Sequence, residues 1–224
     1  MLQLSVIIPV LQEQQRINRT VAAVRRQASR AEIIVVDGDP AGSTLHVITD
    51  PSVIQLTAPA GRGNQLAAGA AVATGDTILM LHADTLLPDH AFCAISSAVG
   101  NGAVWGAFRL GIDTPGLAYR IIEHFVDLRC NLFTLPYGDQ AIFVTRSALQ
   151  QIGGIPPLPL MEDVTLCDRL KRSGHRFMLL PTRVQTSARR WQRDGVIRRT
   201  LHNWWLLLRY RCGYSPETLT QHYR

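Results

Sequence analysis

Three short apolar runs, at residues 4–9, 32–37 and 77–81, constrain the fold of this chain most strongly. Runs of this length that are rich in Val, Ile and Leu are typical of strands buried on both faces. Helical patterns separate them, an amphipathic one at residues 13–27 and an alanine-rich one at residues 61–74. Strands that alternate with helices predict an α/β fold with a mostly parallel central sheet, flanking helices and right-handed crossovers.

The chain after residue 100 shows the same kinds of element in a less regular order. Residues 196–211 predict a C-terminal amphipathic helix that carries two tryptophans. Residues 115–132 predict a helix with one apolar face, made by Ile121, Ile122, Phe125 and Leu128. The remaining expected elements are strands at residues 53–57, 103–110, 140–145 and 176–181 and a helix at residues 161–173.

Charge is distributed unevenly along the chain. Residues 169–224 contain 13 Lys and Arg but only two acids, whereas residues 1–168 contain 10 Lys and Arg against 15 acids. A basic tail on an acidic body predicts contact with something anionic, such as a diphosphate or a weakly bound anionic membrane surface. No nucleic-acid motif accompanies the basic residues, and we expect no nucleic-acid partner. No apolar run approaches the ~18 residues of a membrane span.

Polar side chains that can hold a cation follow the third apolar run. Asp37 and Asp84 both come at the ends of predicted parallel strands, where ligands bind in sheets of this kind. His82 lies two residues before Asp84, so in an extended segment the two side chains point the same way. Imidazole and carboxylate together suit manganese. The alternative is that Asp84 caps a turn and His82 packs in the interior.

Two acids, Glu162 and Asp163, open the helix predicted at residues 161–173. One of them can act as a general base that removes a proton from an acceptor hydroxyl. The loop at residues 153–159, rich in Gly and Pro, is the kind of segment that shapes an acceptor pocket. The alternative is that both acids only stabilise the helix start through capping and the helix dipole.

Two further segments can bind phosphate. Arg189 and Arg190 next to Trp191 can hold a phosphate in bidentate fashion and stack on a ring. The segment 61–65 leads from glycine into a helix, where backbone N–H groups favour an anion. The alternatives are a solvated basic stretch with one buried indole, and an ordinary loop-to-helix turn.

Together these segments resemble the family-two glycosyltransferases of GT-A fold over nearly the whole chain. A small bacterial subgroup named "transferase 2, radical-SAM/selenodomain-associated" is most similar. His82 stands where relatives have the first aspartate of Asp-X-Asp, and Ser187 replaces the glutamine of Gln-X-X-Arg-Trp, so a processive synthase is not expected. The segments that carry the resemblance are residues 5–10, 35–38, 75–76, 81–85, 137–140, 161–164 and 187–191.

The resemblance implies a GT-A domain over residues 1–195, followed by a basic, Trp-rich helix and tail over residues 196–224. Residues 1–110 would bind the nucleotide-sugar and residues 111–195 the acceptor. It implies Asp84 and His82 as ligands of Mn²⁺ or Mg²⁺, Asp163 with Glu162 as the catalytic acids, and Tyr137, Asp139 and Gln140 as acceptor residues. The expected nucleotide-sugar contacts are Pro9, Glu13, Asp37, Arg62, Gln65, Asp76, His82, Ala83, Arg189, Arg190 and Trp191.

The implied activity is a metal-dependent inverting transfer of a hexosyl group. The donor would be a nucleotide-sugar, by default UDP-linked, and the acceptor an unidentified hydroxyl of a lipid or small molecule. A nucleotidyltransferase is the first alternative, but residues 9–13 lack the glycine-rich basic loop of that class. The second is a non-catalytic nucleotide-sugar binder or membrane-surface protein. We expect a cytoplasmic protein, free or peripheral on the inner face of the membrane.

Overall fold

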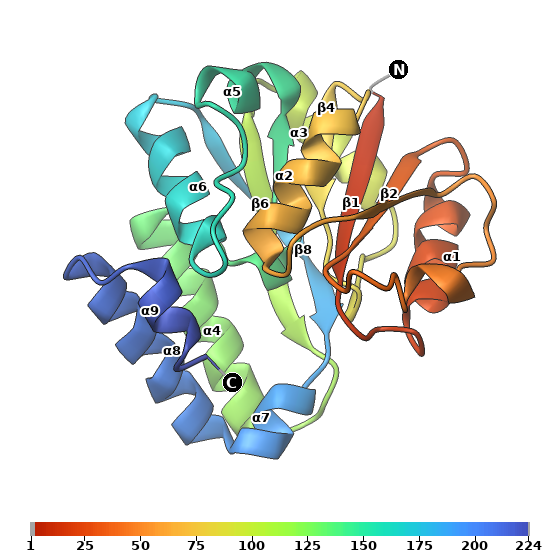
Figure 1. Ribbon diagram of the computed structural model, residues 1–224. Helices are drawn as coiled ribbons and strands as arrows, with labels where there is room; N and C mark the ends of the chain where they lie inside the picture. The colour runs from red at the N-terminus through yellow and green to blue at the C-terminus, as the bar shows by residue number, and fades with distance from the viewer. Residues whose placement is uncertain (1–2, 224) are drawn as a thin grey trace.

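The computed structural model describes residues 3–223, apart from the side chain of Arg190. Its first half contains four parallel strands in the order β3-β2-β1-β4 (Figure 1). The predicted strands of this half are confirmed, with bounds that differ by at most one residue. The strands are β1 (Leu4–Val10), β2 (Glu32–Asp37), β3 (Ile54–Thr57) and β4 (Thr77–Met80).

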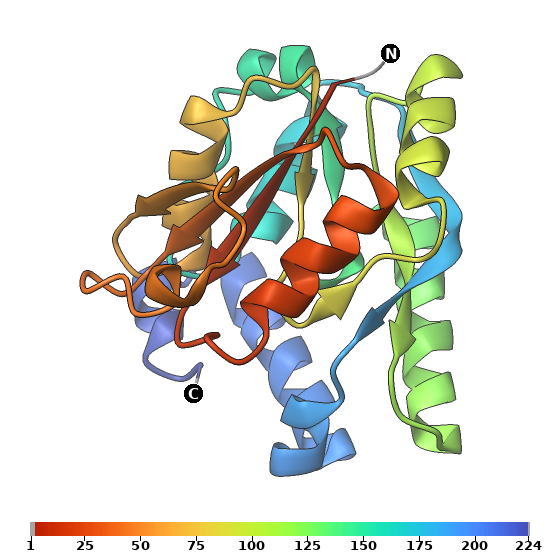
Figure 2. The same cartoon turned by 90° about the vertical axis from the view of Figure 1, so that its right-hand side faces the viewer.

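Alternate side chains of β1 enter two separate cores because helices cover both faces of the sheet. Val6 and Ile8 pack in one cluster with α1 (Ile17–Gln27) and α3 (Ala91–Gly100). Ile7 packs in the other with α2 (Arg62–Val72), α5 (Arg146–Gln151) and α6 (Glu162–Arg172). Figure 2 shows α1 in front of the strands and α2 behind them. This three-layer arrangement is the one that alternating strands and helices predict.

The second half of the sheet mixes parallel and antiparallel pairs. β7 (Phe143–Thr145) runs antiparallel to β4 and β6 (Trp105–Ile112), whereas β6 and β8 (Phe177–Thr186) pair in parallel. β8 continues five residues past its predicted end because it pairs with the whole length of β6. The predicted strand 140–145 is shorter, since a 3₁₀ turn, η2 (Gly138–Gln140), precedes β7. Sequence reasoning did not identify β5 (Thr85–Leu86), α3, α5, α7 (Arg189–Asp194) or α9 (Pro216–Thr220).

Helix α4 (Leu117–Phe133) has its two acids buried, together with Cys130, while six of its apolar side chains are exposed. Glu123 accepts a hydrogen bond from the Ile112 amide at 2.7 Å, and Asp127 pairs with Arg183 at 2.6 Å. These partners lie on β6 and β8, so they hold the acidic face of α4 against the sheet. Of the four residues of the predicted apolar face, Ile121, Phe125 and Leu128 are exposed, whereas Ile122 is half-buried against the core.

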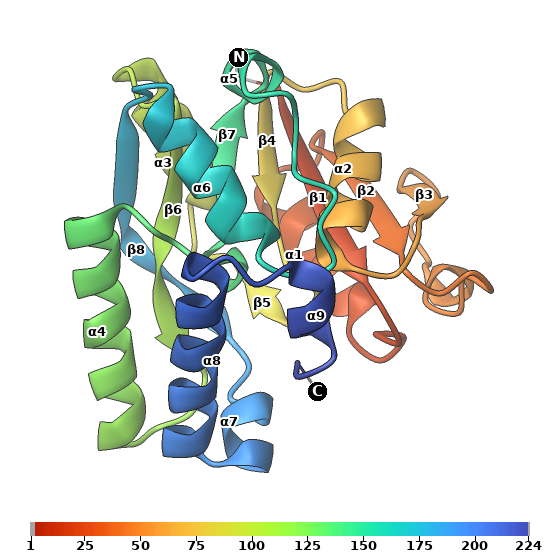
Figure 3. The same ribbon diagram turned by 60° about the vertical axis from the view of Figure 1, so that its left-hand side comes forward.

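Helix α8 (Val196–Arg211) has the bounds predicted for the C-terminal helix. Its Leu206 and the Leu219 side chain of α9 are buried in the same core cluster as Ile7. The three ribbon views place α4, α7 and α8 at the lower end of the molecule, toward which β1 and β4 run (Figures 1, 2 and 3). Over the described residues, no helix is both long and apolar enough to cross a membrane.

Candidate active site

One pocket of about 120 Å³ lies at the carboxyl ends of the parallel strands. Residues from both halves of the chain line it, as expected where strands of an α/β sheet end. His82 and Asp84 come from the segment after β4, and Asp163 comes from the start of α6. The remaining predicted site residues in its lining are Arg62, Tyr137, Asp139 and Trp191.

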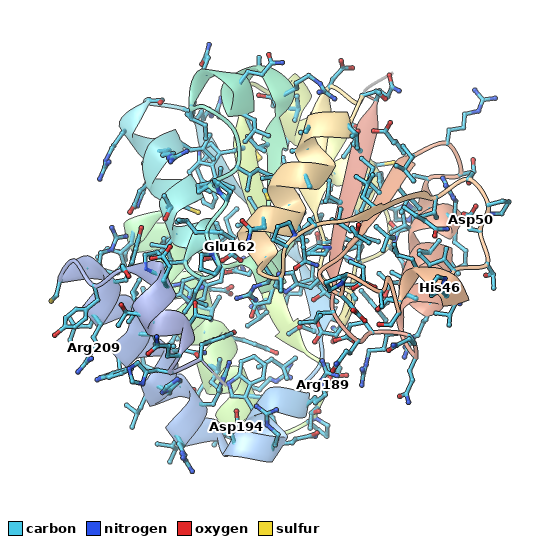
Figure 4. All side chains as sticks on the ribbon, in the orientation of Figure 1. His46, Asp50, Glu162, Arg189, Asp194 and Arg209 are labelled. Carbon is cyan, nitrogen blue, oxygen red and sulfur yellow. The ribbon has the colours of Figure 1, made fainter. Side chains whose placement is uncertain are left out.

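Asp84 lies beside a cationic side chain. The Nη2 atom of Arg189 is 3.5 Å from the Asp84 carboxylate and 3.0 Å from the Glu13 carboxylate. The backbone around Asp84 is fixed, because Thr20 donates a hydrogen bond to the Ala83 carbonyl at 2.7 Å and the Ser187 amide donates to the Asp84 carbonyl. The Asp84 carboxylate therefore meets positive charge from the side of α7, where Figure 4 labels Arg189.

Within residues 3–223, no three His, Cys, Asp or Glu side chains are grouped to hold a metal by themselves. Mg²⁺ and Mn²⁺ sites commonly use one or two carboxylates and take their other ligands from substrate phosphates and water. Asp84 already faces a cationic group, the guanidinium of Arg189, and His82 lines the same pocket. The donor set therefore fits a divalent ion that binds together with a diphosphate.

His82, Gly138 and Asp163 are in close contact across the pocket. A Cβ atom at Gly138 would lie 2.7 Å from Nε2 of His82, so a side chain at position 138 would require the His82 ring to shift. The Gly138 amide donates to Oδ2 of Asp163 at 2.9 Å, and the Val164 amide donates to Oδ1 at 2.8 Å. These backbone donors fix the Asp163 carboxylate at the pocket wall, on the same side as the imidazole of His82.

Glu162 has a different environment from Asp163 although the two are adjacent. Its side chain is only 3% exposed, it lies 3.1 Å from the guanidinium of Arg62, and its Oε2 atom has no hydrogen-bond partner. It lines a small cavity next to the pocket and not the pocket itself. Burial raises the pKa of Glu162 to about 7 against the opposing effect of Arg62, and the charge of Asp163 adds to the rise.

Arg62 and Arg199 hold the ring of Tyr223 between them. Their guanidinium carbons lie 5.7 Å and 4.9 Å from the ring centroid, which is the geometry of cation–π contacts. Burial by itself lowers the pKa of Arg62, but the charges of Glu162 and Asp163 and the contact with Tyr223 together outweigh burial, and the pKa is raised overall. The C-terminal end of the chain thus forms one wall of the pocket.

Sequence reasoning missed this wall. The wall residues Arg199, Asn203 and Leu206 of α8 are spaced by four and three residues and so lie on one face of the helix. This spacing was visible in the sequence, although it did not show that the face lines a pocket. The contribution of Tyr223, in contrast, depends on a tertiary contact. The pocket residues that were not identified from the sequence are Gly138, Leu160, Met161, Val164, Thr186, Ser187, Arg199, Asn203, Leu206, Leu207 and Tyr223.

Three predicted site residues are buried and bond to the protein itself. The Asp37 carboxylate accepts hydrogen bonds from the amides of Asp39 and Thr44. The Gln65 side-chain amide donates to the carbonyls of Val10 and Val36. Gln140 accepts from the Tyr137 amide and from Arg129, and donates to the Phe108 carbonyl. These residues shape the loops around the pocket and do not line it.

Four other predicted site residues also lie outside the pocket lining. Pro9 is buried within β1, and Ala83 contributes its backbone carbonyl to Thr20. Asp76 is exposed at the start of β4, the opposite end of that strand from Asp84, and we remove it from the proposed site. Glu13 adjoins the site through Arg189. The Arg190 side chain lies outside what the structure describes.

Known structures share this arrangement of the chain. S. aureus TarS 1–349 matches with a TM-score of 0.64 and 14% identity, over 83% of this chain and 60% of that one. The mannosyltransferase PcManGT from Pyrobaculum calidifontis, in complex with GDP-Man and Mn²⁺, has a TM-score of 0.64 and 16% identity over 83% and 56%. Glucosyl-3-phosphoglycerate synthase from Mycobacterium tuberculosis, in complex with Mn²⁺, UDP and phosphoglyceric acid, has a TM-score of 0.57 and 16% identity over 83% and 68%.

At these identities the structures establish the fold, which is the GT-A fold of glycosyltransferases. The model of the glycosyl transferase family 2 matches residues 5–151, more than half of the sequence. The chain belongs to this family. No curated protein matches it, and it spans about 60% of the TarS structure.

Proposed function

We propose that the chain is a metal-dependent inverting glycosyltransferase that moves a sugar from a nucleotide-sugar to a hydroxyl acceptor. One observation carries the proposal: the Asp163 carboxylate lines the same pocket as Asp84, although the two come from different halves of the chain. A general base and a diphosphate-binding carboxylate must face one substrate for such a transfer. Structures of the same fold are complexes with Mn²⁺ and GDP-Man or UDP, which supports a nucleotide-sugar donor.

Asp163 acts as the general base. Two backbone amides donate hydrogen bonds to its carboxylate and hold it in place. An amide N–H cannot accept a proton, so Asp163 is the proton acceptor of this group. The attacking hydroxyl gives its proton to Asp163 as the bond to the sugar forms, and the bond to the diphosphate breaks. Glu162 is excluded from this step because it lines the small cavity next to the pocket, so we assign it to holding Arg62 in position.

Asp84, with His82, would hold the divalent ion. A bound Mn²⁺ or Mg²⁺ stabilises the negative charge that develops on a leaving diphosphate. Arg189 occupies the cationic position beside Asp84 in the structure, and it can turn to the diphosphate when the donor is bound. Arg62 lies on the other side of the pocket near Asp163 and adds positive charge there.

Tyr137 and Asp139 border the acceptor side of the pocket, while Gln140 braces their turn from behind. Burial raises the pKa of Asp139, against the lowering effect of Arg129, and the charges of Asp163 and Asp84 add to the rise. The Asp139 carboxyl group lines the pocket and can hydrogen-bond to an acceptor hydroxyl. We therefore place the acceptor between Asp139 and Asp163, and the donor between Asp84 and Arg189.

We also propose a donor, a subgroup, a location and a division of the chain. They are a hexosyl donor linked to UDP, membership of the radical-SAM/selenodomain-associated subgroup, a cytoplasmic location, and the division into a donor half (1–110), an acceptor half (111–195) and a C-terminal segment (196–224). The structure adds that α8 and Tyr223 contribute a wall of the pocket. The C-terminal segment would then take part in substrate binding.

A thermal-shift panel of nucleoside diphosphates, each with and without Mn²⁺, tests the proposal. We expect one nucleotide to raise the unfolding temperature only when Mn²⁺ is present. Asp84→Asn should lose this shift, and the matched variant Asp76→Asn, at the opposite end of β4, should keep it. A panel in which no nucleotide shifts the wild-type protein, with or without Mn²⁺, would contradict the proposal.

A further inference from the structure

Helix α8 has two faces with different environments. One face, including Arg199, Asn203 and Leu206, lines the pocket. The opposite face carries apolar side chains that are open to solvent. Leu201 and Trp204 are each 63% exposed, and the full exposed set on this helix is Ile197, Leu201, Trp204, Trp205 and Leu208. Their spacing places them on one stripe along the helix.

Helix α4 carries a second stripe of the same kind. Its acids are held against β6 and β8, which leaves Ile121 and Phe125 about half exposed, at 47% and 53%. Both helices project at the lower end of the molecule, where the strands that lead into the pocket end (Figures 1 and 3). The exposed apolar set on α4 is Leu117, Ile121, Phe125, Leu128, Leu132 and Phe133.

The charge around these stripes is positive. Helix α8 contains no acid, and the two acids of α4 are buried. Of the four arginines of α8, Arg199 is buried in the pocket wall and Arg211 pairs with Asp168, so Arg198 and Arg209 supply the positive charge beside the stripe. Arg209 lies 4.3 Å from the centroid of the Trp205 ring and projects from the edge of the molecule in Figure 4. Exposed tryptophan, aliphatic side chains and arginine on one helix are the composition of helices that lie in a membrane interface.

We propose that α4 and α8 dock this protein on an anionic membrane surface. Anionic lipids attract the arginines, and the two apolar stripes enter the boundary between head groups and acyl chains. A second copy of this chain fits less well, because a two-fold contact through α8 would pair two helices that each carry arginines and no acid. This docking surface does not depend on the catalytic role proposed for Asp163.

Docking also bears on the acceptor, a consequence that rests on the proposed function. The inner face of α8 lines the pocket while its outer face meets the lipid, so about one helix diameter, ~10 Å, separates the pocket from the membrane. The head group of a membrane lipid can reach across that distance. A hydroxylated lipid head group is therefore the acceptor class that this geometry favours.

Vesicle co-sedimentation of the full chain tests the docking surface. The probes are vesicles with equal parts of phosphatidylcholine and phosphatidylglycerol, and vesicles of phosphatidylcholine alone. We expect binding to the anionic vesicles that weakens at high salt, and little binding to the neutral ones. Leu201→Glu with Leu208→Glu, and separately Ile121→Glu with Phe125→Glu, should each weaken binding at least about tenfold.

The matched control is Val72→Glu, because Val72 is an exposed apolar residue of α2, outside both stripes. It should bind as the wild type does. If a double variant fails to fold, a second measurement uses brominated lipid, which quenches the fluorescence of tryptophans that enter the membrane. Trp204→Phe should then remove most of the quenching. The docking proposal is overturned if the wild type binds neither kind of vesicle or binds both kinds equally. It is also overturned if the stripe variants bind vesicles as Val72→Glu does. A wild-type dimer that does not bind lipid, and that the stripe substitutions dissociate, would show that the stripes form a dimer interface instead. Failure of vesicle binding would not change the thermal shifts expected with nucleoside diphosphates and Mn²⁺, so the two proposals can fail separately.

Discussion

The environment of Glu162 predicts an unusual dependence of stability on pH. Burial raises the pKa of this carboxyl from 4.5 to about 7, so the folded protein binds a proton that the unfolded chain releases. The contribution to stability is complete below pH ~4.5 and is lost as the pH rises through the folded pKa. A pKa raised from 4.5 to about 7, with the charges of Arg62 and Asp163 included, corresponds to about 3 kcal/mol of unfolding free energy.

The perturbation that isolates this effect is Glu162→Gln, which keeps the shape of the side chain and cannot ionise. Urea unfolding followed by circular dichroism gives the free energy of unfolding of both proteins between pH 5 and 8. We expect the wild type to lose about 2.5 kcal/mol of unfolding free energy relative to the variant across this range, because only the wild type has a group at position 162 that ionises as the pH rises. A difference between the two proteins that is constant with pH, or that grows in favour of the wild type, would refute the reasoning.

Glu32 provides an internal control of opposite sign. Burial tends to raise its pKa, but hydrogen bonds from Ser5 and Thr74 outweigh burial and lower it. Its contribution is therefore present above pH ~4.5 and is lost as the pH falls through the lowered pKa. Glu32→Gln should reduce stability at neutral pH, and the reduction should shrink in acid.

Further predictions concern the pocket. Gly138→Ala should lower donor turnover at least about tenfold, because its Cβ would displace the His82 ring or the turn that orients Asp163, while circular dichroism shows an intact fold. Normal turnover in Gly138→Ala would mean that neither His82 nor Asp163 depends on its close contact with residue 138. Tyr223→Ala should weaken nucleotide-sugar binding by about 1 kcal/mol in calorimetric titration through the loss of ring contacts with Arg62 and Arg199, and an unchanged affinity would place the ring outside the binding site.

The fold of the first half could be predicted from the sequence because its signals are local. The run that forms β2 has the bounds Glu32–Asp37 in both the prediction and the structure. The extension of β8 could not be predicted, since residues 182–186 become a strand only by pairing with β6. The burial of the acids of α4 likewise depends on a tertiary contact, because Asp127 pairs with Arg183, which is 56 residues away in the sequence.

The candidate site was predictable in the same uneven way. His82, Asp84 and Asp163 follow a strand end or begin a helix, so the sequence alone directs attention to them. Asp37 has the same type of position, yet its two oxygens bond to backbone amides of the following loop. A carboxylate at a strand end can therefore either bind a ligand or fold a loop, and only the contacts distinguish these roles. The pocket wall from Tyr223 required the folded chain.

A comparison of donor binding and donor turnover in Asp163→Asn tests the central claim most directly. Calorimetry with Mn²⁺ gives the affinity for the nucleotide-sugar, and release of the nucleoside diphosphate gives its turnover. The account predicts an affinity close to that of the wild type and a turnover lower by about 10²- to 10⁴-fold, the range for loss of a general base. Wild-type turnover in Asp163→Asn would contradict the assignment of the base and with it the proposed mechanism.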